Sequence, residues 1–242
     1  MRLVVHEPSE AAWNMAVDEA LLVAGVEPTL RFYGWSPHAV SLGYFQRIEQ
    51  FRDLPPDTPV VRRLTGGGAI HHGDEITFSL TVDAASLPRD IEASYRLLHD
   101  AAVCALTAAG VPSRRLHAGP TAGMRPTDRW CFARPGRDDV VTDRGKLLGS
   151  AQRRIRLPRA RVLHHGSIVL NRPHLTPFVG ATADATACTA VFAQRLRDLL
   201  GLHISRALGM ELRHGALTTA ELALATQLCS ERYRDLAFVQ RS

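Results

Sequence analysis

The sequence predicts an α/β (α+β) fold in which a mixed, largely antiparallel β-sheet is flanked by helices. Segments of alternating apolar and polar residues, typical of strands, are interspersed with segments in which apolar residues recur every three or four positions, as in helices. The two kinds of segment do not alternate as regular βαβ units, which argues against a Rossmann-like parallel sheet. We find no internal repeat and no linker-like segment, so we expect a single domain over residues 1–242.

The chain begins with the pattern of a strand, a helix and two further strands. Residues 2–7 are expected to form a strand, and residues 10–25 a helix, because their apolar residues recur at helical spacing. Ser9 is the candidate N-cap of this helix. Residues 29–35 and 39–45 have strand patterns and are separated by a Ser-Pro turn.

The middle of the chain adds two strands and a long helix. Residues 59–65 form a predicted strand that runs into three glycines. Residues 75–82 read Glu-Ile-Thr-Phe-Ser-Leu-Thr-Val, an alternation that predicts a half-buried strand. Residues 90–109 are expected to form a helix that ends at Gly110.

A loop, a hairpin and another strand follow. The composition of residues 119–129 indicates a loop. Residues 139–155 are expected to form a hairpin that turns at Asp143-Arg144-Gly145. Residues 162–170 are a further predicted strand.

Two helices are expected in the last quarter of the chain. An amphipathic pattern over residues 184–200 predicts a helix that stops at Gly201. The last helix should start near Thr218, with Thr218 or Thr219 as its N-cap and Glu221 in its first turn.

Composition excludes several classes of protein. No stretch of about 18 apolar residues is present, so we expect no membrane span. The N-terminus becomes polar too early for a signal peptide, and a cytoplasmic location is therefore expected. The net charge of +5 and a cluster of arginines fit an acidic partner, but no zinc finger, helix-turn-helix or RNP pattern accompanies them, so nucleic acid is not expected. These arginines are Arg153, Arg154, Arg156, Arg159 and Arg161.

The four cysteines are far apart and form no CxxC pair, which argues against a structural metal site or a disulfide framework. Cys104 and Cys229 lie among apolar residues of predicted helices and are expected in the core. Cys188, also in a helical pattern, is expected to be packed, although it is a rival to Cys131 as a nucleophile.

A glycine-rich segment is the first candidate for binding. Arg62 and Arg63 precede Gly66, Gly67 and Gly68. Glycines allow the backbone to approach a ligand closely, and the arginines supply positive charge for an anionic or carbonyl-bearing ligand. The segment is not a Walker loop, because no GK[ST] follows it. Solvated arginines beside a glycine turn are the alternative.

Cys131 and Lys146 are the candidate reactive pair. Lys146 follows the predicted turn and enters a strand with apolar neighbours, so burial should lower its pKa and let it accept a proton. A nearby base or cation would activate the Cys131 thiol as a nucleophile. Cys131 lies beside two aromatic residues, and from spacing alone a core position remains open.

Two adjacent histidine pairs lie on predicted strands. The pairs are His71-His72 and His164-His165. Because neighbouring residues on a strand face opposite sides, neither pair can hold one metal ion together. We expect no metal, with one histidine of each pair facing the site while its neighbour packs elsewhere.

In order along the chain, these motifs resemble those of one family. Residues 13–22 resemble the N-terminal helix of the catalytic domain shared by lipoate–protein ligases, biotin ligases and octanoyltransferases. Residues 41–46 resemble its S-L-G-Y-F-Q strand, and residues 62–79 its glycine motif, whose following histidine is His72. Residues 146–152 resemble its G-K-x-x-G-S-A-Q motif, and residues 165–167 its H-G-S strand.

Within that family, Cys131-Phe132 resembles the cysteine motif of LipM-type octanoyltransferases. The resemblance implies the biotin/lipoate ligase catalytic-domain fold and a catalytic dyad of Cys131 and Lys146. It implies transfer of octanoyl from octanoyl–acyl carrier protein to a lysine of a lipoyl domain, such as the glycine-cleavage H protein, with no cofactor. The substrate-binding residues it implies are Arg63, Gly66, Gly67, Gly68, His72, Gly149, Ser150, Ala151, His165 and Gly166.

An ATP-dependent ligase is the alternative. The octanoyltransferase pattern reads G-G-R-A, whereas Gly67-Gly68-Ala69 follows the ligase pattern G-G-G-A. Ligases keep the same lysine and would need ATP and Mg²⁺ to form an acyl-adenylate. Cys131, and the expected lack of a C-terminal accessory domain, favour the transferase.

Overall fold

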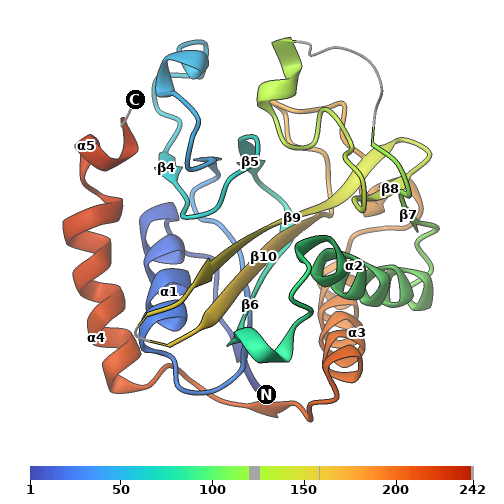
Figure 1. Cartoon of the computed structure of the whole chain (residues 1–242). Coiled ribbons are helices and arrows are strands. Elements are labelled where there is room, and N and C mark those ends of the chain that lie inside the picture. Colours follow the sequence, from blue (N-terminus) through green and yellow to red (C-terminus); the bar gives the residue numbers. More distant parts are fainter. Residues whose placement is uncertain (120–125, 158, 241–242) are drawn as a thin grey trace.

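The protein is built on an eight-stranded sheet and a small three-stranded sheet (Figure 1). The computed structural model describes residues 1–119, 126–157 and 159–240. The order of the large sheet is β11-β1-β2-β6-β10-β9-β8-β7, and that of the small sheet is β4-β3-β5. The strands are β1 (Arg2–Val5), β2 (Thr29–Tyr33), β3 (Ala39–Leu42), β4 (Val60–Arg62), β5 (Ile70–His72), β6 (Glu75–Asp83), β7 (Arg114–Arg115), β8 (Val140–Thr142), β9 (Gly145–Ile155), β10 (Arg161–Val169) and β11 (Arg213–His214).

Helices cover both faces of the large sheet. In Figure 1, α2 and α3 lie on one side of strands β6, β10 and β9, and α1 and α4 lie on the other. The α-helices are α1 (Ala11–Ala24), α2 (Ile91–Ala108), α3 (Ala190–Leu208), α4 (Thr219–Leu228) and α5 (Leu236–Val239). Shorter helical turns are η1 (Ile48–Phe51), η2 (Ala84–Ser86), η3 (Pro126–Arg129), η4 (Thr182–Asp184) and the π-helical η5 (Cys229–Tyr233).

The large sheet is mixed and mostly antiparallel, so the predicted fold class is confirmed. Strand β1 pairs in parallel with β2 and β11. The pairs β2–β6, β6–β10, β10–β9, β9–β8 and β8–β7 are antiparallel. The predicted hairpin is β8–β9, and Gly145 at its turn has a φ of 135°, which favours glycine.

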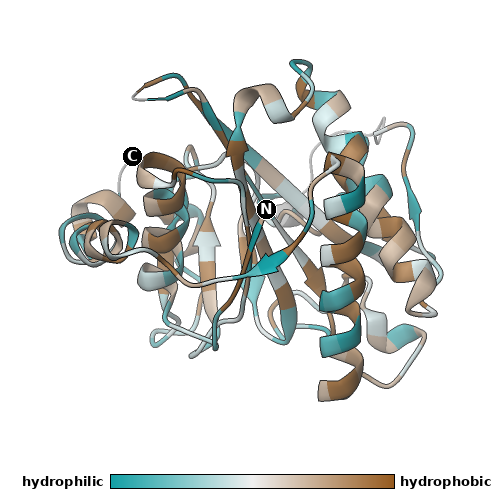
Figure 2. Ribbon diagram, turned by 90° about the horizontal axis from the view of Figure 1, so that it is seen from below, coloured by the Kyte–Doolittle hydropathy of each residue, from teal (hydrophilic) through white to brown (hydrophobic). Residues whose placement is uncertain are grey.

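The face toward α2 and α3 is the apolar core. Strand β6 contributes Ile76, Phe78, Leu80 and Val82 to it, and each helix presents one apolar stripe. Figure 2 shows hydrophobic residues along the central strands and helices that alternate between hydrophobic and hydrophilic residues. Each buried aliphatic or aromatic side chain contributes roughly 1.5–3 kcal/mol, so this face carries much of the stability.

The opposite face of the same strands is polar and also buried. Thr77, Ser79 and Thr81 of β6 point to this side, and all three are at most 3% exposed. The prediction of a half-buried strand was therefore wrong. The alternation is real, but α1 packs against the polar side and removes it from water.

Helix α3 differs from its prediction at both ends. It begins after Thr189, whose hydroxyl accepts a hydrogen bond from the Phe192 amide, and it runs through Gly201 to a left-handed Gly209 with φ of 64°. A Cβ on Gly201 would lie 3.3 Å from Leu212 Cδ1. Gly201 therefore permits close packing within the helix and does not end it.

The other termini give a mixed result. Ser9 is not a cap: the N-cap position of α1 is Glu10, which makes no side-chain cap hydrogen bond, and the Ser9 hydroxyl donates to the Glu7 carbonyl. Thr218 caps α4 with Glu221 in a capping box, as predicted. A Ser-Pro turn does follow β2, with Ser36-Pro37 cis, but β2 and β3 enter different sheets.

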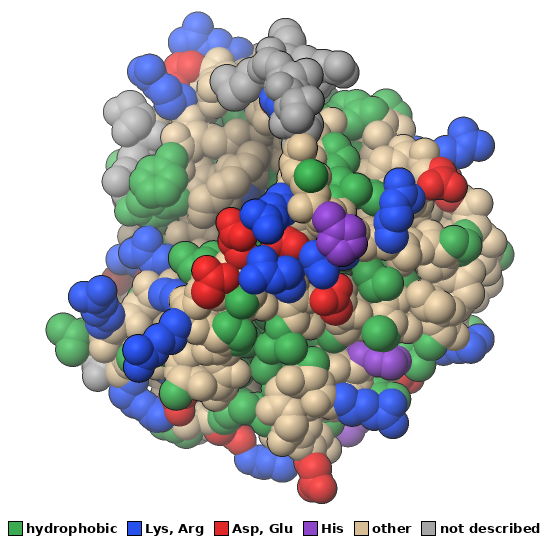
Figure 3. Space-filling view, turned by 45° about the vertical axis from the view of Figure 1, so that its right-hand side comes forward, with side chains coloured by type: hydrophobic (Ala, Val, Ile, Leu, Met, Phe, Trp, Pro, Cys, Tyr) green, Lys and Arg blue, Asp and Glu red, His purple; other side chains and the backbone are tan. Residues whose placement is uncertain are grey.

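The arginine cluster is not one basic surface, because neighbouring strand residues point to opposite sides. Arg154 donates to the Pro88 carbonyl and the Ser94 hydroxyl, Arg159 pairs with Asp83, and Arg161 is 1% exposed. Figure 3 likewise shows acidic side chains among basic ones over the middle of one face. Acidic partners therefore gain no support from this cluster.

The other cysteines also depart in part from expectation. Cys229 is buried, as predicted, but Cys104 is exposed on α2. Cys188 is packed but lies before α3, not in a helix. Among the helices that the structure describes, none combines the length and apolar composition needed to cross a lipid bilayer. The cytoplasmic location stays a prediction.

Candidate active site

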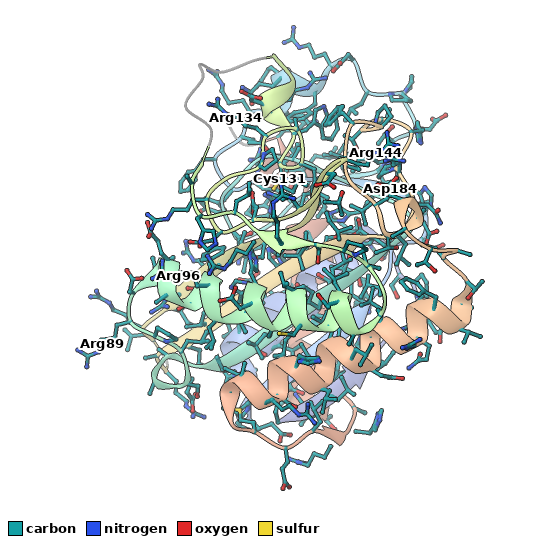
Figure 4. All side chains as sticks on the ribbon, turned by 90° about the vertical axis from the view of Figure 1, so that its right-hand side faces the viewer. Arg89, Arg96, Cys131, Arg134, Arg144 and Asp184 are labelled. Carbon is teal, nitrogen blue, oxygen red and sulfur yellow. The ribbon has the colours of Figure 1, made fainter. Side chains whose placement is uncertain are left out.

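Cys131 and Lys146 meet in space. The Lys146 Nζ atom lies 3.3 Å from Cys131 Sγ and 3.2 Å from the Cys131 carbonyl oxygen. Cys131 follows the η3 turn, and its amide donates to the carbonyl of Ala69 at 2.8 Å, which ties the cysteine to the end of the glycine loop. The thiol is half-buried, and Figure 4 shows it above α2, between Arg134 and Arg144 in that view.

A β-bulge sets the direction of Lys146. Val140 pairs with Leu148 and Val141 pairs with Lys146, so Leu147 is an extra residue in β9. Without it, Lys146 would project to the same side as Leu148, into the apolar core. The bulge turns the lysine toward Cys131.

Gly149 makes room for the lysine. A Cβ on Gly149 would lie 2.3 Å from Lys146 Cε and 2.6 Å from its Nζ. A side chain at this position would require the end of the Lys146 side chain to move. Gly149 does not line the cavity described below; its effect is to let Lys146 cross the strand toward Cys131.

Asp139 is a residue of the site that the sequence reasoning missed. Its Oδ2 atom lies 2.8 Å from Lys146 Nζ and accepts a hydrogen bond of 2.6 Å from the Gly136 amide. Asp139 is the first residue of the predicted hairpin, opposite the lysine strand. That position was the available signal.

The pKa of Lys146 is raised, so the predicted depression was wrong. Burial alone would lower the pKa of this ammonium. The charges of Cys131 and Asp139, both within hydrogen-bonding distance, outweigh burial. Lys146 is therefore an ammonium ion in the free enzyme.

A cavity adjoins the cysteine, and its empty space, part of it open to solvent, amounts to about 410 Å³. It follows the row Ser167, Thr77 and Tyr33, which are successive partners in β10, β6 and β2 and all line it. Apolar side chains, including those of Met15, Trp35 and Ile70, contribute to its wall. The predicted residues that line it are Cys131, Arg63, Gly66, Gly67, His72, Ser150, Ala151, His165 and Gly166.

Gly68 and Lys146 were predicted with this group but do not line the cavity. A Cβ on Gly68 would lie 2.7 Å from the Cys131 amide nitrogen, so this glycine lets the loop lie against the cysteine backbone. Ser150 lines the cavity, but its hydroxyl bonds to His99 Nε2 at 2.6 Å, away from the ligand side.

Arg63 holds the glycine loop from within. Its guanidinium donates to the carbonyls of Gly66 and Gly68 at 2.9 and 2.7 Å, and to the Ser41 carbonyl at 3.0 Å. It also donates to the hydroxyls of Ser41 and Thr65. Burial lowers its pKa. Arg63 is a rigid cationic support of the loop, not a solvated surface charge.

His72 and His165 connect this arginine to two buried carboxylates. His72 lies 2.7 Å from the Ser41 hydroxyl and 2.6 Å from Glu75. His165 lies 2.7 Å from the Thr65 hydroxyl and 3.2 Å from Asp18. The prediction that one histidine of each pair faces the site agrees with this arrangement.

The charge states of this network are consistent with neutral His72. Burial lowers the pKa of His72, although Glu75 opposes this effect. Burial raises the pKa of Glu75 and of Asp18, but hydrogen bonds and charges from His72, His165 and Arg31 lower both below their usual range. Neutral His72 then donates from Nδ1 to ionised Glu75 and accepts from Ser41 at Nε2.

The remaining histidines and cysteines do not join the site. His164 packs near Tyr95 and His99 on the α2 side, and His71 lies on the far side of β5 from His72. Cys188 bonds to the Thr182 hydroxyl at 2.8 Å, and burial raises the pKa of its thiol. Across the described residues, no three His, Cys, Asp or Glu side chains are grouped closely enough to hold a metal ion.

Comparison with known proteins agrees with this geometry. The model of the lipoyl protein ligase A/B catalytic domain matches residues 10–199. Octanoyltransferase LipM of Kyrpidia tusciae is 32% identical over 97% of this chain and 96% of its own length. LipM of an Exiguobacterium species is 40% identical over 70% of this chain, and the match covers 65% of that protein.

Solved structures share the fold at lower identity. Protein Ta0514 of T. acidophilum with bound lipoic acid has a TM-score of 0.80 and 22% identity, and the match covers 99% of this chain and 98% of that one. A lipoate-protein ligase A bound with ATP has a TM-score of 0.79 at 22% identity, with the same coverage.

The chain belongs to the lipoyl protein ligase A/B catalytic domain family. Within that family, its relatives named octanoyltransferase LipM confirm the prediction of an acyltransferase of the octanoyltransferase type. The ligase structures are only 22% identical to this chain, so they show that the fold is shared and nothing more.

Proposed function

We propose that the protein transfers an octanoyl group from octanoyl–acyl carrier protein to a lysine of a lipoyl domain, such as the glycine-cleavage H protein, through a thioester on Cys131. One observation carries this proposal: the Cys131 thiol lines a cavity and lies 3.3 Å from the Lys146 ammonium. A cation at that distance favours the thiolate, which is the nucleophilic form of cysteine. The names of the LipM relatives support the octanoyl donor.

Two steps account for the transfer. The Cys131 thiolate attacks the thioester carbonyl of the donor, and the bond between the acyl carbon and the carrier's sulfur breaks. The carrier's thiolate then takes a proton from Lys146. The amine of the acceptor lysine then attacks the Cys131 thioester and displaces the thiolate. Neutral Lys146 receives the proton that the amine loses, which restores the starting state.

Acylation changes the balance of charges around Lys146. The charge on Cys131 is one of the causes that raise the pKa of Lys146, and it disappears when the sulfur carries an acyl group. Burial and Asp139 then act alone on the amine. Lys146 therefore loses its proton more easily in the acyl-enzyme than in the free enzyme. This is the stage at which it must give a proton to the departing carrier thiolate.

The energetics need no ATP. Exchange of one thioester for another is nearly isoenergetic, and conversion of a thioester to an amide is favourable. The octanoyl tail lies in the cavity next to Cys131, where roughly six buried methylenes contribute about 5 kcal/mol at about 0.8 kcal/mol each. Backbone N–H groups of the glycine loop or near Gly149 and Ser150 stabilise the oxyanion.

The test is an incubation with octanoyl–acyl carrier protein and a lipoyl domain, without ATP. We expect octanoylated lipoyl domain, and an octanoyl adduct on Cys131 in intact-mass spectra when the acceptor is omitted. Cys131→Ser should abolish both products, while Cys188→Ser should leave them unchanged. Product that requires ATP and free octanoate, and persists in Cys131→Ser, would identify a ligase and refute the proposal.

A further inference from the structure

A groove lies between α1, the second half of β9 and the loop that follows β4. Its empty space, part of it open to solvent, amounts to about 830 Å³. Leu22 of α1, Leu64 of the loop and Ile155 of β9 are among the apolar side chains that line it. The mechanism of acyl transfer described above uses none of these side chains.

The groove adjoins the cavity that contains the reactive thiol. On β9, Ala151 lines the cavity, and Arg153, the next residue on the same face of the strand, lines the groove. In the loop after β4, Gly66 lines the cavity and Leu64 lines the groove. The Cβ position of Gly149 lies 3.5 Å from the reactive sulfur. Because a strand advances about 3.3 Å per residue, Arg153 follows Gly149 by about 13 Å along β9.

Arg153 gives the groove a positive charge. This exposed guanidinium lies 5.9 Å from the centre of the Tyr44 ring, and it forms no ion pair within the part of the chain that the structure describes. Glu19 and Arg232, which also line the groove, pair with each other. The charge on Arg153 is therefore left for a partner, and it favours one with a carboxylate.

An exposed aromatic side chain lies at the rim of the groove. Phe45 is 82% exposed, and its ring meets that of Tyr44 edge-on, with 5.1 Å between the ring centres. It also lies 3.9 Å from the Cβ position of Gly66 in the glycine loop. Aromatic and arginine side chains often contribute most of the binding energy of protein interfaces. The rim therefore has the composition of a protein-binding surface next to the cysteine cavity.

The acceptor protein is the partner that must come close to this rim. The side chain of a lysine reaches only about 6 Å from its backbone. The backbone around the target lysine must therefore lie against the opening of the cavity when the amine attacks the Cys131 thioester. A carrier protein holds its acyl group on a longer prosthetic arm, so the carrier itself can stay farther from the cysteine.

We propose that the groove docks the segment of the acceptor protein next to its target lysine, with an acidic residue of that segment paired to Arg153 and an apolar residue packed on Phe45. This inference rests on the proposed function and concerns only its second step. With the target amine at Cys131, an extended segment covers the distance of about 13 Å to Arg153 in about four residues. The acidic residue is therefore expected within about four positions of the target lysine.

Separate measurement of the two half-reactions tests this inference. Acylation of Cys131 by octanoyl–acyl carrier protein, and transfer from the acylated protein to a lipoyl domain, are each followed by intact-mass spectrometry in single turnovers. Arg153→Glu should lower the second-order rate constant of transfer by about tenfold or more, while the acylation rate changes by less than about twofold. The unchanged acylation shows that the variant is folded. At saturating lipoyl domain, transfer should approach the wild-type rate, because Arg153 acts on binding and not on the reacting atoms.

Arg89→Glu is the matched control for charge. It makes the same change at an exposed arginine that points away from Cys131 in Figure 4, and it should leave both rates within about twofold of wild type. An increase in salt from about 20 to about 300 mM should slow transfer by wild-type protein more than transfer by Arg153→Ala, because salt screens exposed charges. Phe45→Ala should slow transfer several-fold, whereas Val191→Ala, at a side chain 79% exposed on α3, should not.

A charge exchange identifies the residue of the acceptor that contacts Arg153. Acidic residues within about four positions of the target lysine are replaced by lysine, one at a time. One replacement should reproduce the loss of transfer with the wild-type protein, and the same acceptor variant should regain transfer with Arg153→Glu.

Transfer by Arg153→Glu at the wild-type rate would overturn the inference, as would an equal loss of transfer in Arg89→Glu. A loss confined to the acylation of Cys131 would also overturn it, and would assign the groove to the carrier protein instead. These outcomes leave the proposed function standing. Failure of octanoyl–acyl carrier protein to acylate the wild-type protein would instead refute the proposed function itself.

Discussion

The two faces of strand β6 share one backbone and serve different purposes. Toward α2 and α3, Phe78 and Leu80 join the apolar core. Toward α1, Thr77 and Ser79 join the network of buried carboxylates, with hydrogen bonds of 2.5 Å to Glu75 and 2.7 Å to Asp18. Both faces are buried, so burial alone does not distinguish a core from a site.

The difference lies in how strongly each face depends on geometry. Apolar packing is non-directional and stabilises in proportion to buried area. A buried polar group instead costs free energy unless each of its partners is in place. The polar face therefore has few acceptable arrangements, and this constraint positions Arg63, His72 and His165 around the cavity. Changes on the polar face and around the thiol should impair transfer first, and changes on the apolar face should impair folding first.

Loss of the nucleophile should have the largest effect. Cys131→Ser is expected to lower octanoyl transfer by roughly a thousandfold or more, because a hydroxyl beside an ammonium is not ionised. The melting temperature should stay within a few degrees of wild type. Transfer assays and thermal unfolding measure the two quantities, and a variant with full activity would remove Cys131 from the mechanism.

Displacement of Lys146 should come next. Gly149→Ala places a methyl group where Lys146 now lies, at 2.3 Å from its Cε, so the ammonium must move away from the thiol. We expect about a hundredfold loss in the rate of Cys131 acylation, within the range of general acid–base effects. Gly110→Ala, a glycine with nothing near its Cβ position but a positive φ of 85°, controls for backbone strain. It should cost stability without slowing acylation.

Removal of Asp139 should shift the pH dependence. Asp139 raises the pKa of Lys146, so Asp139→Asn should lower that pKa. Acylation uses the ammonium form of Lys146. The acylation rate should therefore begin to fall at a lower pH in the variant than in wild type. The measurement is the rate of Cys131 acylation as a function of pH. We expect the rate of the variant to be roughly tenfold below that of wild type near the alkaline limb. An unchanged profile would show that Asp139 does not act through Lys146.

Neighbours on β6 offer the most direct comparison of the two faces. Leu80→Ala should lower the free energy of unfolding by about 2–5 kcal/mol and leave the activity of the folded protein nearly unchanged. Ser79→Ala removes a hydrogen bond to Asp18 and should cost about 1–3 kcal/mol, with a few-fold loss of transfer. Denaturant unfolding and transfer rates test both. If Leu80→Ala lowered transfer by the folded protein more than Ser79→Ala does, the assignment of one face of β6 to stability and the other to the site would be wrong.

The residues that carry the chemistry could be recognised in the sequence because the reaction restricts them to a few residue types in a fixed order. Cys131, Lys146, the glycine loop and the site-facing histidines His72 and His165 were predicted in this way. The mixed sheet was predicted from the pattern of apolar residues. Local rules also predicted the hairpin at Gly145 and the capping box at Thr218, since turns and caps depend on neighbouring residues.

Other features required the tertiary structure, because they arise from contacts between distant segments. The alternation of β6 was visible, but its polar side is buried only because α1 covers it. In the sequence, Gly201 predicts the end of a helix. In the structure it lies within α3, where Leu212 packs against it. The pKa of Lys146 rises, although burial alone would lower it, because Asp139 and Cys131 lie beside it. Sequence determined which groups are present; folding decided which charges are neighbours, since Coulomb interactions depend on distance in space and not along the chain.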